Sequence, residues 1–322
     1  MDLRGWECAD VILFSADAYV DHPAFGAADI GRLLEAEGLR VCIVPQPDWH
    51  GDFPDFKKLG RPRLFFGISP GCMDSMVNKY TAARRLRSED AYSPDGRHDL
   101  RPEYPTIVYT DILRKLFPDV PIVLGGIEAS LRRVMHYDYW QERFRPSILC
   151  DCDADLITYG MGEKPTLELV RRLNEAINDF HPLLHYDENG EPCITREVLR
   201  EVAKELPQTA WLCKKEEIPG GIKEDDIVLH SFEDCLREPK LHAENFRHIE
   251  EESNKIHAQR LLQMVSGKCV NGKCMWVVVN PPYPPLTSEE LDRSFDLPYT
   301  RLPHHKYKGK RIPAYEMIKF SV

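Results

Sequence analysis

The stretch VILFSADAYVDHPAFGAADIGRLLEAEGLRVCIV, residues 11–44, contains two apolar runs separated by a polar loop and an amphipathic segment. The first run, at residues 11–14, is short and apolar, which is typical of a strand buried on both faces. From Gly26 onward, Ile30, Leu33 and Leu34 recur at helical spacing, and Gly38 ends this segment before the second run at residues 41–44. The stretch predicts a strand–helix–strand crossover of about 30 residues.

The same unit recurs through the first half of the chain. Strand-like runs lie at residues 64–68 and 121–124 and within residues 154–163, and helical patterns lie at residues 73–87 and 107–117 and after Pro165. Strands that alternate with helices indicate an α/β fold, a doubly wound parallel sheet covered by helices on both faces. In such sheets, ligands bind beyond the carboxyl ends of the strands.

The second half has a different character. We expect an α/β domain over residues 1–180, a polar connector over 181–225, and an α+β segment over 226–322. The expected elements of that last segment are a strand at residues 226–232, one long helix at 241–265, a hairpin at 269–274, a strand at 275–279 and an unfinished strand at the apolar tail. Residues 87–105 have no periodicity and predict a long loop, either functional or mobile.

Composition excludes several classes of protein. The net charge of −10 argues against sequence-independent binding to nucleic acid, which requires a basic face. No stretch reaches the roughly 18 apolar residues of a membrane span, and residues 1–10 lack the features of a secretion signal. The ten cysteines are scattered through apolar segments, so we expect most of them to be reduced thiols in the core of a cytoplasmic protein.

Polar and glycine residues gather where the predicted strands end, and we expect the loops that carry them to lie on the surface and to converge on one crevice. Each loop also has a simpler interpretation, as a tight turn or, for the HYDYW stretch, as a half-buried helix edge. The candidate ligand-binding residues are Asp17, Tyr19, Asp21, His22, Gly125, Gly126, Glu128, His136, Asp138, Gly160, Gly162 and Glu163. We expect substitution of Asp21 or His22 to change stability by only about 0.5 kcal/mol.

Three apparent cofactor motifs fail on closer reading. The stretch at residues 267–273 has P-loop spacing, but Cys274 replaces the magnesium-binding hydroxyl and no helix is expected to follow. Pro165 stands where the third glycine of a dinucleotide fingerprint belongs. The cysteine pairs at residues 150–152 and 269–274 lack a second pair at zinc spacing, and no three cysteines have iron–sulfur spacing. We therefore predict no metal site in this chain.

Several stretches together resemble the N-terminal region of YgiQ-type radical SAM proteins. These stretches are VILFSADAYVDHPAFG, IVLGGIEASLRR with HYDYW, ADLITYGMGEKPTLELV, and the tail VVNPPYPPLTSEELDRSFDLPYTRLPHHKYKGKRIPAYEMIKFSV. The similarity spans essentially the whole chain. More distantly, GGIEAS and YGMGEKP resemble the cobalamin-binding type of domain that precedes many radical SAM barrels, which implies a cobalamin-binding-like fold here.

The resemblance implies cofactors for a longer protein. In the family, this tail leads into a C-x-x-x-C-x-x-C motif whose thiolates hold a [4Fe-4S] cluster that binds S-adenosylmethionine. This chain ends at Val322, before such a motif would begin. The expected enzyme is therefore a radical SAM protein of unknown substrate whose barrel lies beyond this chain. Without the cluster cysteines, we expect the 322-residue chain alone to be inactive.

Two alternatives remain open. Cobalamin-binding domains of the base-off type carry D-x-H-x-x-G, but here Val20 stands in the position of the acid before His22, and Gly26 comes one residue late. This departure argues against cobalamin ligation by His22 and leaves cobalamin as an alternative cofactor. The second alternative is a non-enzymatic module that binds a ligand on its own.

Overall fold

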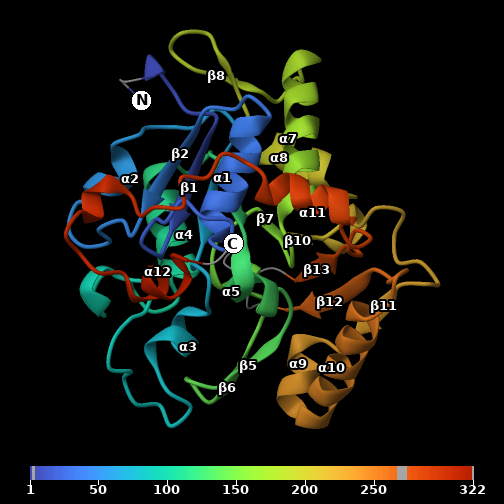
Figure 1. Cartoon of the computed structure of the whole chain (residues 1–322). Coiled ribbons are helices and arrows are strands. Elements are labelled where there is room, and N and C mark those ends of the chain that lie inside the picture. Colours follow the sequence, from blue (N-terminus) through green and yellow to red (C-terminus); the bar gives the residue numbers. More distant parts are fainter. Residues whose placement is uncertain (2–3, 267–273, 321–322) are drawn as a thin grey trace.

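A computed structural model describes the chain except for residues 2–3, 267–273 and 321–322. Its centre is a nine-stranded sheet of order β11-β12-β13-β10-β7-β4-β3-β1-β2 (Figure 1). The strands are β1 Val11–Ser15, β2 Val41–Pro45, β3 Phe65–Ser69, β4 Ile122–Leu124, β7 Leu156–Thr158, β10 Thr209–Cys213, β11 Ile227–Leu229, β12 Leu261–Val265 and β13 Met275–Val279.

The sheet is parallel on one side and mixed on the other. β2, β1, β3, β4 and β7 pair in parallel, which confirms the predicted parallel sheet. β10 then pairs antiparallel with both β7 and β13, β12 pairs antiparallel with β13, and β11 pairs in parallel with β12. One sheet thus contains strands from all three predicted segments, and the division at residues 180 and 225 stays a prediction.

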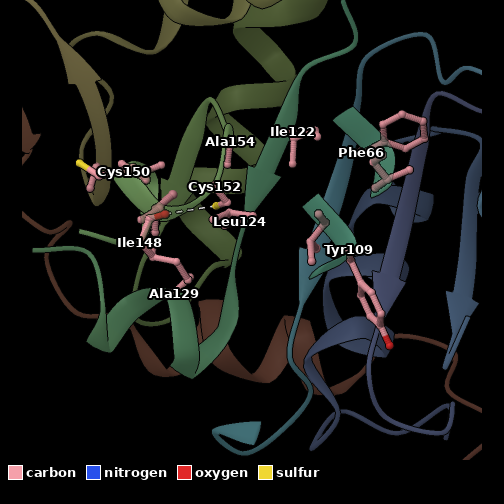
Figure 2. Packing of buried hydrophobic residues seen from close by; sticks show 14 of the residues in the cluster. Phe66, Tyr109, Ile122, Leu124, Ala129, Ile148, Cys150, Cys152 and Ala154 are labelled. Carbon is pink, nitrogen blue, oxygen red and sulfur yellow. Dashed lines mark hydrogen bonds between the residues drawn. The ribbon is translucent and has the colours of Figure 1, made fainter. Parts of the chain in front are cut away.

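Helices cover both faces of this sheet. Because successive side chains of a strand point to opposite faces, Ile12 and Phe14 of β1 pack into one apolar cluster while Val11 and Leu13 pack into another. The first cluster lies under α2 Pro54–Lys57, α4 Pro105–Leu116, α6 Ile148–Asp151 and α9 Phe232–Arg237. The second lies under α1 Gly26–Ala36, α7 Glu163–Asn178 and α8 Arg196–Ala203. Figure 2 shows part of the first cluster, including Phe66, Tyr109 and Leu124.

The remaining elements surround these layers. They are α3 Ser75–Lys79, α5 Gly126–Leu131, α10 Pro239–Ser253, α11 Ser288–Phe295, α12 Pro313–Ile318, the strand pairs β5 His136–Asp138 with β6 Arg143–Arg145 and β8 His185–Tyr186 with β9 Pro192–Cys193, and short 3-10 turns at Pro94–Gly96, Lys215–Glu217 and His305–Tyr307. Two of these elements, α5 and α10, also contribute residues to the first cluster. None of the helices within the described residues has the length and apolarity needed to cross a membrane.

Three expected elements are wrong. The helix expected at residues 73–87 is only α3, which Asp74 caps and which ends where the backbone becomes extended at Tyr80. The long helix expected at residues 241–265 is instead α10 followed by β12, because the run LLQMV is buried as an inner strand between β11 and β13. The tail expected as an unfinished strand contains α12, with Pro313 in its first turn.

Two further predictions concern cysteines and a turn. Cys152, Cys193, Cys213 and Cys235 are free thiols, and these four and Cys150 are buried, as expected for cysteines of the core. The hairpin expected at residues 269–274 lies, apart from Cys274, outside the described residues.

Candidate functional site: a crevice at the carboxyl edge of the sheet

Strands β1, β3, β4 and β7 all end at one edge of the sheet, and a cavity of about 330 Å³ opens there beside α1 and α7. This volume falls within the range of small-molecule sites. Its walls come from the strands, from the loops that follow them and from the first turns of α1, α5 and α7. Its lining includes Leu13, Ala27, Asp29, Ile30, Phe65, Val123, Gly125, Gly126, Thr158, Gly160, Gly162, Glu163 and Leu169.

Glycines form much of the mouth of this crevice. Gly126 has φ +80° and Gly160 has φ +69°, a backbone conformation that other residues adopt only with strain. A side chain at Gly126 would also meet Pro70 Cδ and Ser69 Oγ at 3.0 Å. The structure therefore places the predicted residues Gly125, Gly126, Gly160, Gly162 and Glu163 on one cavity.

Two carboxyl groups face this largely apolar space. Asp29 is 9% exposed, and its Oδ1 accepts hydrogen bonds from Ser294 Oγ at 2.6 Å and from Tyr299 OH at 3.1 Å. Burial raises the pKa of Asp29 above its ordinary value. Burial, together with the nearby charge of Asp29, also raises the pKa of Glu163. The Oε2 atom of Glu163 is buried and accepts no hydrogen bond from the described residues.

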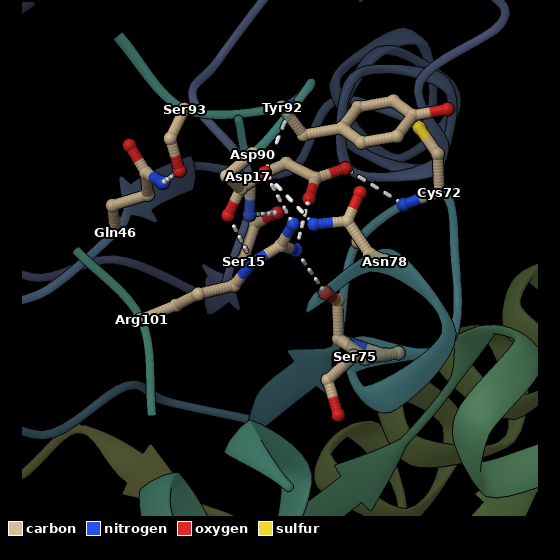
Figure 3. A network of polar contacts seen from close by, with 12 residues as sticks. Ser15, Asp17, Gln46, Cys72, Ser75, Asn78, Asp90, Tyr92, Ser93 and Arg101 are labelled. Carbon is tan, nitrogen blue, oxygen red and sulfur yellow. Dashed lines mark hydrogen bonds and ion pairs between the residues drawn. The ribbon is translucent and has the colours of Figure 1, made fainter. Parts of the chain in front are cut away.

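Asp17, in contrast, belongs to a buried ion network beside the crevice (Figure 3). Arg101 NH1 donates to Asp17 Oδ1 at 2.9 Å, and its Nε and NH2 donate to the two oxygens of Asp90 at 2.8 and 2.6 Å. The backbone amide of Cys72 donates to Asp17 Oδ2 at 2.7 Å. Residues 87–105, predicted as a functional or mobile loop, thus supply the arginine and second aspartate that hold the loop after β1.

Asp21 is held by α1 and by a segment far along the chain that we call the C-terminal strap, residues 294–312. Arg32 donates from Nε and NH2 to the two oxygens of Asp21 at 3.0 and 2.5 Å, and the amide of Thr300 donates to Asp21 Oδ2 at 2.9 Å. Burial alone would raise the pKa of Asp21, but hydrogen bonds from Arg32 and Thr300 outweigh it and lower that pKa.

The strap also covers Tyr19 and His22. The backbone of residues 19–21 pairs with that of residues 301–304, and Tyr19 OH donates to Asp21 Oδ1 at 3.1 Å. His22 is buried, its Nδ1 accepts from the amide of Ala24 at 3.1 Å, and burial lowers its pKa. The expectation of a surface loop is therefore wrong for Asp17, Asp21 and His22, because the strap and residues 87–105 cover the loop.

Glu128, His136 and Asp138 lie in a separate polar region. Glu128 is fully buried and accepts from Ser75 Oγ at 2.6 Å, while Arg132 pairs with Asp74 beside it. Asp138 accepts from Tyr104 OH at 2.8 Å. His136 stands in β5, so the helix edge considered for HYDYW is wrong, and burial lowers its pKa to about 4. None of these three residues lines the crevice.

Asp29 is the crevice residue that sequence reasoning missed. It is buried in the first turn of α1, next to Ile30, which packs against the second apolar cluster. The sequence did contain a signal for Asp29. An acidic residue at a buried helix position is energetically unfavourable without a cationic partner, and such a residue therefore indicates a functional group.

The described residues do not fit the cofactors that the resemblance suggests. Among them, no three His, Cys, Asp or Glu side chains are grouped to hold a metal ion, whereas an open [4Fe-4S] cluster requires three thiolates. His22 does not line the crevice, so it is not placed to ligate a cobalamin there.

Comparison with known proteins identifies the family. A radical SAM N-terminal family model matches residues 1–321. A UPF0313 protein of Bacteroides thetaiotaomicron is 62% identical over the whole chain, and one of Porphyromonas gingivalis is 57% identical. The UPF0313 protein YgiQ of Escherichia coli K12 is 40% identical over 355 aligned residues.

These relatives are longer than this chain. All 322 residues are covered, but they correspond to 49%, 46% and 46% of the three relatives, so the chain spans about half of their length. The quoted stretches and the matches agree, and the chain belongs to the radical SAM N-terminal family, within the UPF0313 group that includes YgiQ.

Proposed function

We propose that this chain is the N-terminal region of a radical SAM enzyme and that its crevice binds a small-molecule substrate, or part of one. The observation that carries the proposal is the cavity at the carboxyl edge, which is lined by the buried Asp29, the half-buried Glu163 and a mouth of glycines. Family membership supports the radical SAM assignment, and the position of the cavity agrees with the general site of ligands in parallel sheets.

The cofactors are proposed for the longer protein. A [4Fe-4S] cluster with S-adenosylmethionine would supply the radical chemistry. Its ligands would come from the part of the relatives that this chain does not span, because the described cysteines are not grouped for that role. On this proposal, the residues of this chain bind and orient the substrate, exclude water from it and present two carboxyls to it. A cobalamin-binding-like ancestry of the fold is part of the same proposal.

Two alanines of α1 give a matched test. Ala27 lines the crevice, while Ala36 is exposed at the last turn of the same helix. In the full-length protein, we expect Ala27→Leu to fill the crevice and Ala36→Leu to leave it open. The readout is formation of 5′-deoxyadenosine from S-adenosylmethionine, with and without a small-molecule extract of the cell.

The expected result is that the extract stimulates the wild type and Ala36→Leu but not Ala27→Leu. Equal stimulation of all three proteins would contradict a substrate role for the crevice. A stand-alone binding module is the rival function. It predicts that the full-length protein forms no 5′-deoxyadenosine under any of these conditions, even though the crevice still binds small molecules.

A further inference from the structure

We propose that the crevice selects a ligand with a protonated amine next to an apolar body, and that Asp29 and Glu163 hold the amine. The inference rests on the proposed role of the crevice as a ligand site and adds the chemical class of the ligand. It follows from the charge, the hydrogen-bond partners and the wall of the cavity.

The charge of the lining is the first argument. Asp29 and Glu163 are its two charged residues, and none of the described lining residues is lysine, arginine or histidine. Lys164, the nearest cation along the chain, turns away and pairs with Glu290 at 2.9 Å. Two carboxyls thus share a poorly hydrated space without a basic partner, which favours a cationic ligand over an anionic one.

Hydrogen bonding gives the second argument. Ser294 and Tyr299 both donate to Oδ1 of Asp29, and no described residue donates to its Oδ2. Glu163 Oε2 is buried and accepts no hydrogen bond from the described residues. Buried acceptors are normally satisfied, and an ammonium group offers three donors and a compensating charge.

Other ligand classes fit less well. A divalent cation needs about six oxygen ligands, yet no group of three candidate ligands exists in the described part of the chain. The N-termini of α1 and α7 would attract an anion, but Asp29 and Glu163 stand in those first turns and already neutralise them. The rest of the wall, including Leu13, Phe65 and Val123, is apolar and suits a hydrocarbon body.

Three probes of nearly equal shape test this class: 2-phenylethylamine, 2-phenylethanol and phenylacetate. Their affinities for the intact protein at pH 7 are measured by isothermal titration calorimetry. We expect the amine to bind about tenfold more tightly than the alcohol, which corresponds to the loss of one charge-assisted contact, and phenylacetate to bind most weakly.

Three conservative variants complete the test. Glu163→Gln and Asp29→Asn should each lower the affinity for the amine about fivefold or more, and should leave the affinity for the alcohol unchanged. Glu175→Gln, on the exposed part of α7, is the matched control and should change neither affinity. Asparagine at position 29 can still accept from Ser294 and Tyr299, so its fold is expected to persist.

The outcomes separate the two proposals. If the alcohol binds as tightly as the amine and Ala27→Leu abolishes both, the crevice is a ligand site but the amine class is wrong. If no probe binds, or if the amine binds equally to Glu163→Gln and Asp29→Asn, the amine class is also wrong. Failure of the proposed function is distinct, because it requires Ala27→Leu to leave substrate stimulation of the full-length enzyme unchanged.

Discussion

The loop after β1 and the crevice loops after β4 and β7 leave the same edge of one sheet. The first is covered by other segments of the chain, whereas the other two line an open cavity. The loop after β1 carries more polar groups, and its carboxyls are held by Arg101, Arg32 and the C-terminal strap. The loops after β4 and β7 carry mainly glycine, and they leave a cavity with two carboxyls that have no cationic partner. A loop at the end of a strand can therefore bind a ligand only where no other segment covers it. Which loops are covered depends on segments that are distant in sequence.

This difference predicts opposite responses to mutation. Groups that the protein itself satisfies contribute to stability, so their loss should be costly. Polar groups whose partner would be a ligand contribute little to the stability of the free protein, and replacing them can even raise that stability.

The largest loss of stability is expected for the loop after β1, whose carboxyls are held by arginines. Arg101→Ala leaves Asp17 and Asp90 buried without their shared cation and should lower the free energy of unfolding by about 3–5 kcal/mol. Urea denaturation measures this change. Arg171→Ala, which removes the exposed ion pairs with Glu168 and Glu175 on α7, is the control and should have a much smaller effect. A comparable small loss for Arg101→Ala would show that the network does not hold the loop.

The same network should make stability depend on pH. Burial raises the pKa of Asp17 from 3.8 to about 6, even though Arg101 and the amide of Cys72 oppose this shift, and Asp90 adds to it. Between these two values the folded state binds more protons than the unfolded state, so the free energy of unfolding falls as pH rises, by up to about 3 kcal/mol. Asp17→Asn should remove this part of the slope between pH 4 and 7. A variant with the wild-type slope would contradict the raised pKa.

The next largest loss of stability is expected when the contacts of Asp21 with the C-terminal strap are removed. Asp21→Ala removes the two hydrogen bonds from Arg32 and leaves the Thr300 amide without its acceptor, so it should cost about 2 kcal/mol. Thermal and urea unfolding check this value. Asp99→Ala, which breaks the exposed pair with Arg97, should stay within about 0.5 kcal/mol. If Asp21→Ala were equally mild, the surface loop expected from sequence would be the better description.

Much of the fold could be predicted from sequence because its signals are local. Apolar runs such as residues 11–14 and the helical spacing after Gly26 mark β1 and α1 directly. The failures occur where partners are remote. The run LLQMV after α10 has an ambiguous period, and only its neighbours β11 and β13 make it a strand.

The candidate site shows the same limit. Gly126 and Gly160 mark the crevice because their positive φ favours glycine, and a glycine is a local signal in the sequence. The burial of Asp21 and His22 depends on strap residues about 280 positions away, such as Thr300, and no local pattern encodes that distance. Asp29 was missed for a related reason, since its carboxyl becomes a crevice group only when α1 and α7 meet over the sheet.

The most direct test of the central claim compares Glu163→Gln with Asp21→Ala in one urea denaturation experiment at pH 7. Because burial and Asp29 raise the pKa of Glu163, the folded state disfavours its ionised form, and glutamine relieves that cost. The account predicts that Glu163→Gln is neutral within about 0.5 kcal/mol or more stable than the wild type, while Asp21→Ala loses about 2 kcal/mol. Equal losses in the two variants would contradict the account, because Glu163 would then be as structural as Asp21.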